Sequence, residues 1–155
     1  MRILFHKVSD ERHVLEIVRD DGRREQVACE TRSYLQHDLL HCAAEAEAKL
    51  DGGFWGNLAG GKTLAEINDR TGKSMGGEQM PAIEQAVGVL SRSVKGVTAE
   101  TLVAGFRGYA ATADSRVPDW FTVEFVSAVQ ERMRRLLGRW KATPYGDSME
   151  LGWPA

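Results

Sequence analysis

The sequence predicts a single α+β domain, with an N-terminal three-stranded antiparallel meander followed by about four main α-helices. Two observations predict this class. The first thirty residues contain three β-type segments joined by turns, whereas the residues after them follow helical periodicity. Because no strand is expected between the later helices, the sheet should be antiparallel. The predicted domain covers 1–143, and residues 144–155 are expected to form an irregular C-terminal tail that lies along the surface or is anchored by Trp153.

The three predicted strands follow one another closely. Ile3–Val8 is short and rich in apolar, β-branched and aromatic residues. Val14–Arg19 and Arg24–Cys29 flank a turn that contains Asp21-Gly22. Since an Asp-Gly pair readily supplies the positive φ angle of a tight hairpin, these two segments should pair. We therefore expect a meander with one face on the core and the other in water.

The helical part contains four predicted main helices and one short one. The first covers Tyr34–Leu50, where good helix formers dominate, and a short helix follows Thr63. Two further helices begin near Pro81 and at the capping residue Thr98. The last and longest, Asp119–Lys141, carries an apolar stripe at spacings of three and four residues.

Composition narrows the classes of function. A chain of 155 residues with 43% hydrophobic and 27% charged residues is typical of a globular protein. Its net charge of −2 does not favour nucleic-acid binding, and no apolar run is long enough to span a membrane. The N-terminus lacks a signal-peptide pattern, and Cys29 and Cys42 are expected to be reduced thiols. We therefore expect a cytoplasmic protein with neither nucleic-acid nor membrane partners.

The first predicted helix carries four ligand-type side chains on one face, opposite an apolar face that should contact the core. At 100° per residue, these side chains are His37, Asp38, His41 and Glu45. Imidazole and carboxylate groups together suit zinc, iron, manganese or nickel. The four residues are therefore candidate ligands of a divalent transition metal, with Asp38 or Glu45 either completing the ligand set or orienting a histidine.

The spacing also limits this hypothesis. The pattern H-D-x-x-H is similar to the zincin signature, but Asp38 is one methylene shorter than the glutamate of that motif. Glu45 lies about two helical turns, ~12 Å, from His37, so a single ion needs a further ligand from elsewhere in the fold. Two alternatives need no metal: a solvated ladder of ion pairs, or histidines buried under the following Gly-rich loop with a structural role.

A second signal is a Gly-rich segment that matches the letters of a nucleotide phosphate loop. GNLAGGKT, residues 56–63, satisfies G-x-x-x-x-G-K-[ST], which makes Gly61, Lys62 and Thr63 candidate phosphate-binding residues. A phosphate loop must leave a buried parallel strand, and here a predicted helix precedes the segment. Nucleotide binding is therefore disfavoured, and the glycines are better explained by a tight loop whose aromatic neighbours pack into the core.

The run HDLLHCAAEAEAKLDGGFWGNLAGG resembles a helix–loop motif of small bacterial proteins to which no activity is assigned. The resemblance covers roughly residues 34–61. It is carried by the start of the helix, His37-Asp38-Leu-Leu-His41, and by the turn Gly53-Phe54-Trp55-Gly56. The resemblance implies a bacterial source and transfers no catalytic role to any residue.

Two functions of different classes follow from these observations. The leading hypothesis is a metal or small-ligand site formed by the His37/Asp38/His41 helix and the Gly-rich loop, with metal-assisted or general acid–base chemistry. The alternative is a non-enzymatic homodimeric interaction module that associates through the Phe- and Trp-rich helix Asp119–Lys141. Burial separates them, because a functional site lies in a concave pocket and a solvated stripe lies on open surface. Whether the chain is an enzyme depends on which hypothesis holds.

Overall fold

The computed structural model, described over residues 1–67, 79–113 and 115–154, has an α+β fold and confirms the predicted class. All three predicted strands form, and they pair as an antiparallel meander in the order β3-β2-β1. The turn between the last two contains Gly22 at a φ of 86°, as the Asp-Gly prediction requires. The strands are β1 (Arg2–Lys7), β2 (Arg12–Val18) and β3 (Arg24–Glu30).

The prediction of an irregular tail is wrong, because part of the tail forms a fourth strand, β4 (Ser148–Gly152). This strand pairs antiparallel with β1 and completes the sheet order β3-β2-β1-β4. Its side chains alternate, so that Met149 and Leu151 are buried while their neighbours are exposed. Trp153 is also buried, and its backbone N–H donates to the Met1 carbonyl, which confirms the alternative in which this residue anchors the tail.

The four predicted main helices are confirmed, with shorter helical segments between them. The cap at Thr98 forms as predicted, since its side chain accepts a hydrogen bond from the Thr101 N–H. The last helix begins after a second such cap, Thr122, and therefore starts later than expected. The main helices are α1 (Gln36–Ala48), α4 (Met80–Leu90), α5 (Ala99–Thr112) and α6 (Val123–Ala142). The shorter segments are η1 (Thr31–Leu35), α2 (Phe54–Ala59), α3 (Leu64–Ile67) and η2 (Ser91–Lys95).

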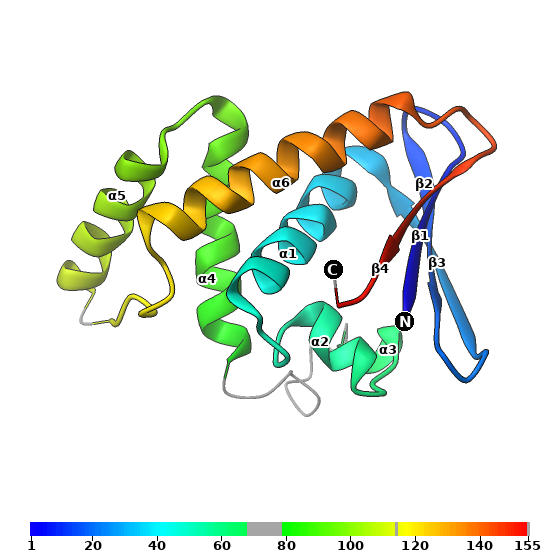
Figure 1. The fold of residues 1–155 in the computed structure, drawn as a ribbon, viewed down its shortest axis with the longest axis horizontal. Coiled ribbons are helices and arrows are strands. Elements are labelled where there is room, and N and C mark those ends of the chain that lie inside the picture. Colours follow the sequence, from blue (N-terminus) through cyan, green and yellow to red (C-terminus); the bar gives the residue numbers. More distant parts are fainter. Residues whose placement is uncertain (68–78, 114, 155) are drawn as a thin grey trace.

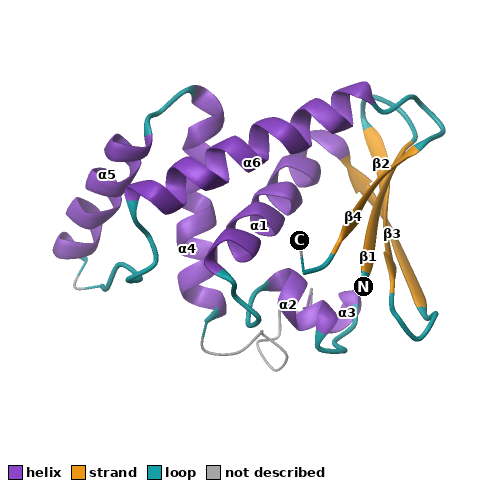
Figure 2. Ribbon diagram, viewed as in Figure 1, coloured by secondary structure: helices purple, strands orange, loops and turns teal. Residues whose placement is uncertain are grey.

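The helices cover one face of the sheet, and α1 lies in the middle of them (Figures 1 and 2). It contacts α2, α4 and α6, so residues 38–45 are buried on every side of the helix. The predicted apolar face does pack on the core, since Leu39, Cys42 and Ala43 are buried there. Asp38, His41 and Glu45 on the polar face are buried as well, because α2 and α4 pack against α1, and helical periodicity alone does not predict this cover.

The long helix α6 uses its apolar stripe inside the monomer. Phe125, Val129, Met133 and Trp140 are all buried in the core that this helix shares with α1 and the sheet. The aromatic surface that suggested a homodimer is thus already covered within one chain. Among the described residues, no helix combines the length and the apolar composition needed to cross a lipid bilayer.

Candidate metal centre

Two helices bring three metal-ligating side chains together. His37 and His41 lie one turn apart on α1, and their ring centroids are 4.6 Å apart. Glu84 reaches toward them from α4. One ligand atom from each of the three side chains lies within 4.8 Å of the other two. Glu84 is therefore the further ligand that the spacing on the first helix requires. It lies on α4, and no sequence pattern linked this helix to the histidines.

His41 is buried, and its two ring nitrogens have different surroundings. Nδ1 lies 3.1 Å from Oε1 of Glu45, one helical turn further along α1. Nε2 makes no hydrogen bond to any described residue, and Oε1 of Glu84 lies 3.4 Å away at ion-pair distance. A buried polar atom without a hydrogen bond is uncommon in native proteins, and strain, a catalytic role or a bound water or ion can explain it.

Glu45 is fully buried and fixes the start of α2. Its carboxylate accepts hydrogen bonds from the backbone N–H groups of Phe54 at 2.8 Å, Trp55 at 2.9 Å and Gly56 at 3.2 Å. These N–H groups have no partners inside their own helix, and a negative charge at this end also complements the helix dipole. Glu45 thus connects His41 to the Gly-rich segment as a structural anchor.

The glycines of the Gly-Phe-Trp-Gly turn are explained by this close packing. A Cβ atom at residue 53 would overlap the Glu45 carboxylate, and a Cβ atom at residue 56 would overlap the backbone of Asp51. Only glycine leaves room for the buried carboxylate and for the chain that returns beside it. The turn is therefore shaped around Glu45.

The carboxylates also control the protonation of the site. Burial lowers the pKa of His41, but the neighbouring carboxylates of Glu45 and Glu84 outweigh burial and raise this pKa to about 9. In turn, His41 lowers the pKa of Glu84. Without a metal ion, the site at neutral pH therefore holds a protonated imidazole between two carboxylates.

Of the four candidate ligands on the first helix, the structure brings only His37 and His41 into this group. Oδ1 of Asp38 lies 3.5 Å from Nδ1 of His37, and Glu45 is bonded to His41 and to the start of α2. The hypothesis of a solvated ladder is wrong for His41 and Glu45, which are buried. His41 is buried beside Phe54 of the Gly-rich segment, as the other alternative expects of its position, while the side chain of His37 is 50% exposed.

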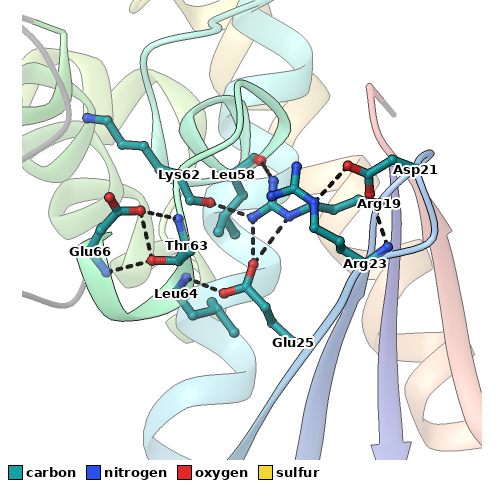
Figure 3. A network of polar contacts seen from close by, with 9 residues as sticks. All are labelled: Arg19, Asp21, Arg23, Glu25, Leu58, Lys62, Thr63, Leu64 and Glu66. Carbon is teal, nitrogen blue, oxygen red and sulfur yellow. Dashed lines mark hydrogen bonds and ion pairs between the residues drawn. The ribbon is translucent and has the colours of Figure 1, made fainter.

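The phosphate-loop hypothesis is wrong, because residues 54–59 form the helix α2 and the segment cannot wrap a phosphate. The three candidate residues have other roles, and Figure 3 shows those of Lys62 and Thr63. Gly61 turns the chain at a φ of 107°, and the Lys62 carbonyl accepts a hydrogen bond from Arg19 at 2.5 Å. The Thr63 hydroxyl accepts from the Glu66 N–H at 3.2 Å, and the Glu66 carboxylate accepts from the Thr63 N–H at 2.7 Å, which forms a capping box at the start of α3.

Arg19 anchors the other end of this segment, a role that no sequence pattern indicated (Figure 3). Its buried guanidinium donates to the carbonyls of Leu58 and Lys62 and to the carboxylate of Glu25. The second carboxylate oxygen of Glu25 accepts from the N–H of Leu64 at 2.8 Å. The residues between α2 and α3 are therefore held to the sheet by a connected set of hydrogen bonds, which we call the Arg19 cluster.

Comparisons of the chain with protein-family models, with curated proteins and with solved structures found no match.

Proposed function

We propose that this protein binds a divalent transition-metal ion through His37, His41 and Glu84. Two imidazoles and one carboxylate form a ligand set that zinc and non-haem iron use in proteins. The observation that carries the proposal is that one ligand atom from each of His37, His41 and Glu84 lies within 4.8 Å of the other two. The buried Nε2 of His41 faces Oε1 of Glu84 at 3.4 Å without a well-aligned hydrogen bond, so a metal ion between them would bind both groups.

The hydrogen bond behind His41 supports this role. A metal-binding histidine usually donates its second ring N–H to a carboxylate, which orients the ring and sets its tautomer. Glu45 accepts from Nδ1 of His41 and is itself held by three backbone N–H groups. The ring is thereby fixed with Nε2 directed toward Glu84. Asp38 lies beside Nδ1 of His37 in a similar way, although at a longer distance of 3.5 Å.

The exposure of the other two ligands gives the site access to solvent. The side chains of His37 and Glu84 are 50% and 47% exposed, so an ion can enter from the surface and contact the buried His41 at the inner side of the site. Three protein ligands leave coordination positions free for water or substrate, as in catalytic rather than structural zinc sites. We therefore assign the site to metal-assisted chemistry, in which the ion would act as a Lewis acid.

The proposal is tested by metal analysis of protein purified without an affinity tag. We expect about one equivalent of a transition metal by plasma mass spectrometry, either as isolated or after incubation with zinc, iron, manganese or nickel. Glu84→Gln and His37→Asn should each lower the bound metal at least tenfold, in line with the loss of one ligand of three. Both changes are at half-exposed positions, so the fold should be retained.

Glu131→Gln is the matched control, because Glu131 is a helical glutamate with a similar exposure of 44% and lies in ion pairs with Arg134 and Arg135. It should leave the metal content unchanged. If folded wild-type protein binds none of the four metals, or if Glu84→Gln and Glu131→Gln bind equally well, the proposal is wrong.

A further inference from the structure

Three polar side chains from three neighbouring strands meet on the face of the sheet that the helices leave uncovered (Figure 2). His6 lies on β1 directly opposite Ser148 on β4. Glu16 lies on β2 opposite Leu4, which places it diagonally beside His6 on the same face. The residues on the opposite face of these strands, such as Phe5, are buried against the helices.

These side chains form a continuous chain of hydrogen bonds. Oγ of Ser148 lies 2.6 Å from Nδ1 of His6, and Nε2 of His6 lies 2.7 Å from Oε2 of Glu16. An ionised carboxylate can only accept, so Nε2 carries the proton and Nδ1 accepts from the serine hydroxyl. This tautomer is assigned from the hydrogen-bond network.

The carboxylate at the end of the chain is held in place, whereas the serine at the other end is accessible. The Glu16 side chain is only 4% exposed, and its second oxygen lies 3.2 Å from Nη1 of Arg24. Burial raises the pKa of Glu16, but the hydrogen bonds from His6 and Gln26 and the charge of Arg24 outweigh burial and lower this pKa. Ser148 is exposed at the start of an edge strand. A fixed carboxylate, an imidazole and an open hydroxyl thus lie in sequence.

We infer that Ser148 is a nucleophile that is activated by His6 and reacts with activated carboxylic esters. The arrangement corresponds to a serine–histidine–acid triad, which is recognised by geometry rather than by sequence order. In the usual triad the serine bonds to Nε2 and the acid to Nδ1, whereas here the serine bonds to Nδ1 and the acid to Nε2. Glu16 is a positioning residue that holds the ring in the required tautomer. This activity is separate from the proposed metal centre and uses none of its residues.

The reaction balances with the groups that are present. Oγ of Ser148 attacks the ester carbonyl carbon while Nδ1 of His6 takes the hydroxyl proton. The bond from the carbonyl carbon to the alkoxy oxygen then breaks, and the leaving alcohol receives that proton from His6. The product is an O-acyl serine. A water molecule, deprotonated by His6, then attacks the acyl carbon, the bond from this carbon to Oγ breaks, and His6 returns the proton to Oγ, which releases the carboxylic acid and restores the serine.

A fluorophosphonate probe, which forms a stable adduct with activated serines, tests the assignment on the full-length protein. The experiment is done in the presence of EDTA, so that its outcome is independent of metal binding at His37, His41 and Glu84. We expect one adduct per chain, located on Ser148 by peptide mapping. His6→Gln should slow labelling by about 100-fold or more, the scale of general-base catalysis.

Glu16→Gln tests the positioning role with an activated ester, p-nitrophenyl acetate. It should lower the maximal rate of p-nitrophenol release while the half-saturating ester concentration stays unchanged, because it alters the imidazole and not ester binding. Ser33→Ala is the matched control. The Ser33 hydroxyl is also exposed and donates to a carboxylate, that of Glu30 at 2.6 Å, without an intervening imidazole. It should leave labelling unchanged.

The result on wild-type protein is decisive, so the test does not depend on the folding of any variant. If folded wild-type protein acquires no adduct at Ser148, or labels there no faster than at Ser33, the inference is wrong. Equal labelling of wild type and His6→Gln, with matching circular-dichroism melting curves, would also overturn it.

Discussion

Two buried ionic clusters hold the same segment of the chain, one at each end of α2. At the N-terminal end, the carboxylate of Glu45 accepts from three backbone N–H groups. At the C-terminal end, the guanidinium of Arg19 donates to the carbonyls of Leu58 and Lys62 (Figure 3). An anion at the start of a helix and a cation at its end both complement the helix dipole. Both clusters therefore stabilise α2 by bonding the backbone groups at its ends.

They differ in how completely their polar groups are bonded. Each of the three guanidinium nitrogens of Arg19 donates to a protein oxygen. In the cluster at the other end, Nε2 of His41 is buried and makes no hydrogen bond within the described part of the chain. A fully bonded buried network stabilises a unique fold, whereas a buried polar atom without a hydrogen bond is open to a further ligand such as a water molecule or an ion. This difference supports a binding site at His41 and a structural role for Arg19.

The largest expected effect is the loss of Arg19. Arg19→Met removes a charge that is only 8% exposed and leaves Glu25 and two carbonyls without their donor. We expect the free energy of unfolding in urea to fall by about 3–5 kcal/mol. Arg23→Met is the control, since Arg23 is 66% exposed and pairs only locally with Asp21, and it should cost below about 1 kcal/mol. Equal effects of the two changes would contradict the structural role of Arg19.

Metal should stabilise the protein only through His37, His41 and Glu84. At a zinc concentration 100-fold above the dissociation constant, the expected gain is about 2.7 kcal/mol. For a chain of this size, this gain corresponds to a rise in Tm of about 5–10 °C. Glu84→Gln should remove the rise, whereas Arg19→Met should lower the starting Tm and keep the rise. A zinc-dependent shift that survives Glu84→Gln would place the metal elsewhere.

The fit of the turn around Glu45 predicts a smaller loss. Gly53→Ala introduces a Cβ atom that overlaps the buried Glu45 carboxylate, and relieving the overlap should cost about 1–3 kcal/mol. Gly60→Ala is the control, because its Cβ would lie 3.4 Å from the nearest described atom and its φ of −70° suits alanine. Thermal unfolding of both variants measures the difference. If both variants melt with the wild type, the turn is not shaped by Glu45.

Local patterns predicted the parts of the fold that depend on neighbours in sequence. The Asp-Gly turn and the Thr98 cap each act over a few residues, and both form as expected. The strand β4 was missed because its partner, β1, lies at the other end of the chain. The five-residue alternation of Ser148–Gly152 has no neighbouring strand in sequence with which to form a hairpin, so its pairing depends on tertiary packing.

In the candidate site, too, the contacts within one helix could be predicted and the contact between helices could not. Helical spacing predicted that His37 and His41 lie together, and the rings do approach each other. Glu84 could not be predicted, because its position depends on the packing of α4 against α1. The phosphate-loop letters were correctly discounted because a helix rather than a strand precedes them. The spacing of Gly56 and Gly61 matches the motif, but Gly56 lies inside α2, where a Cβ atom would overlap the backbone of Asp51.

The smallest predicted effect is the acid sensitivity of Glu25. Burial raises the pKa of Glu25, but the hydrogen bonds from Arg19 and from the Leu64 N–H outweigh burial and hold this pKa below its ordinary value of 4.5. A carboxyl group with a lowered pKa in the folded state stabilises the protein fully above its ordinary pKa, and this contribution is lost as the pH falls through the lowered value.

Glu25→Gln keeps an acceptor oxygen for Arg19 and removes the charge, so it should cost less than Arg19→Met. The difference in unfolding free energy between wild type and Glu25→Gln should be constant from about pH 7 to about pH 5 and should shrink toward about pH 3. Urea titrations at each pH measure this difference. A constant difference down to the lowest pH would mean that the charge of Glu25 adds nothing. The Arg19 cluster would then be held by its two carbonyl acceptors, which do not titrate.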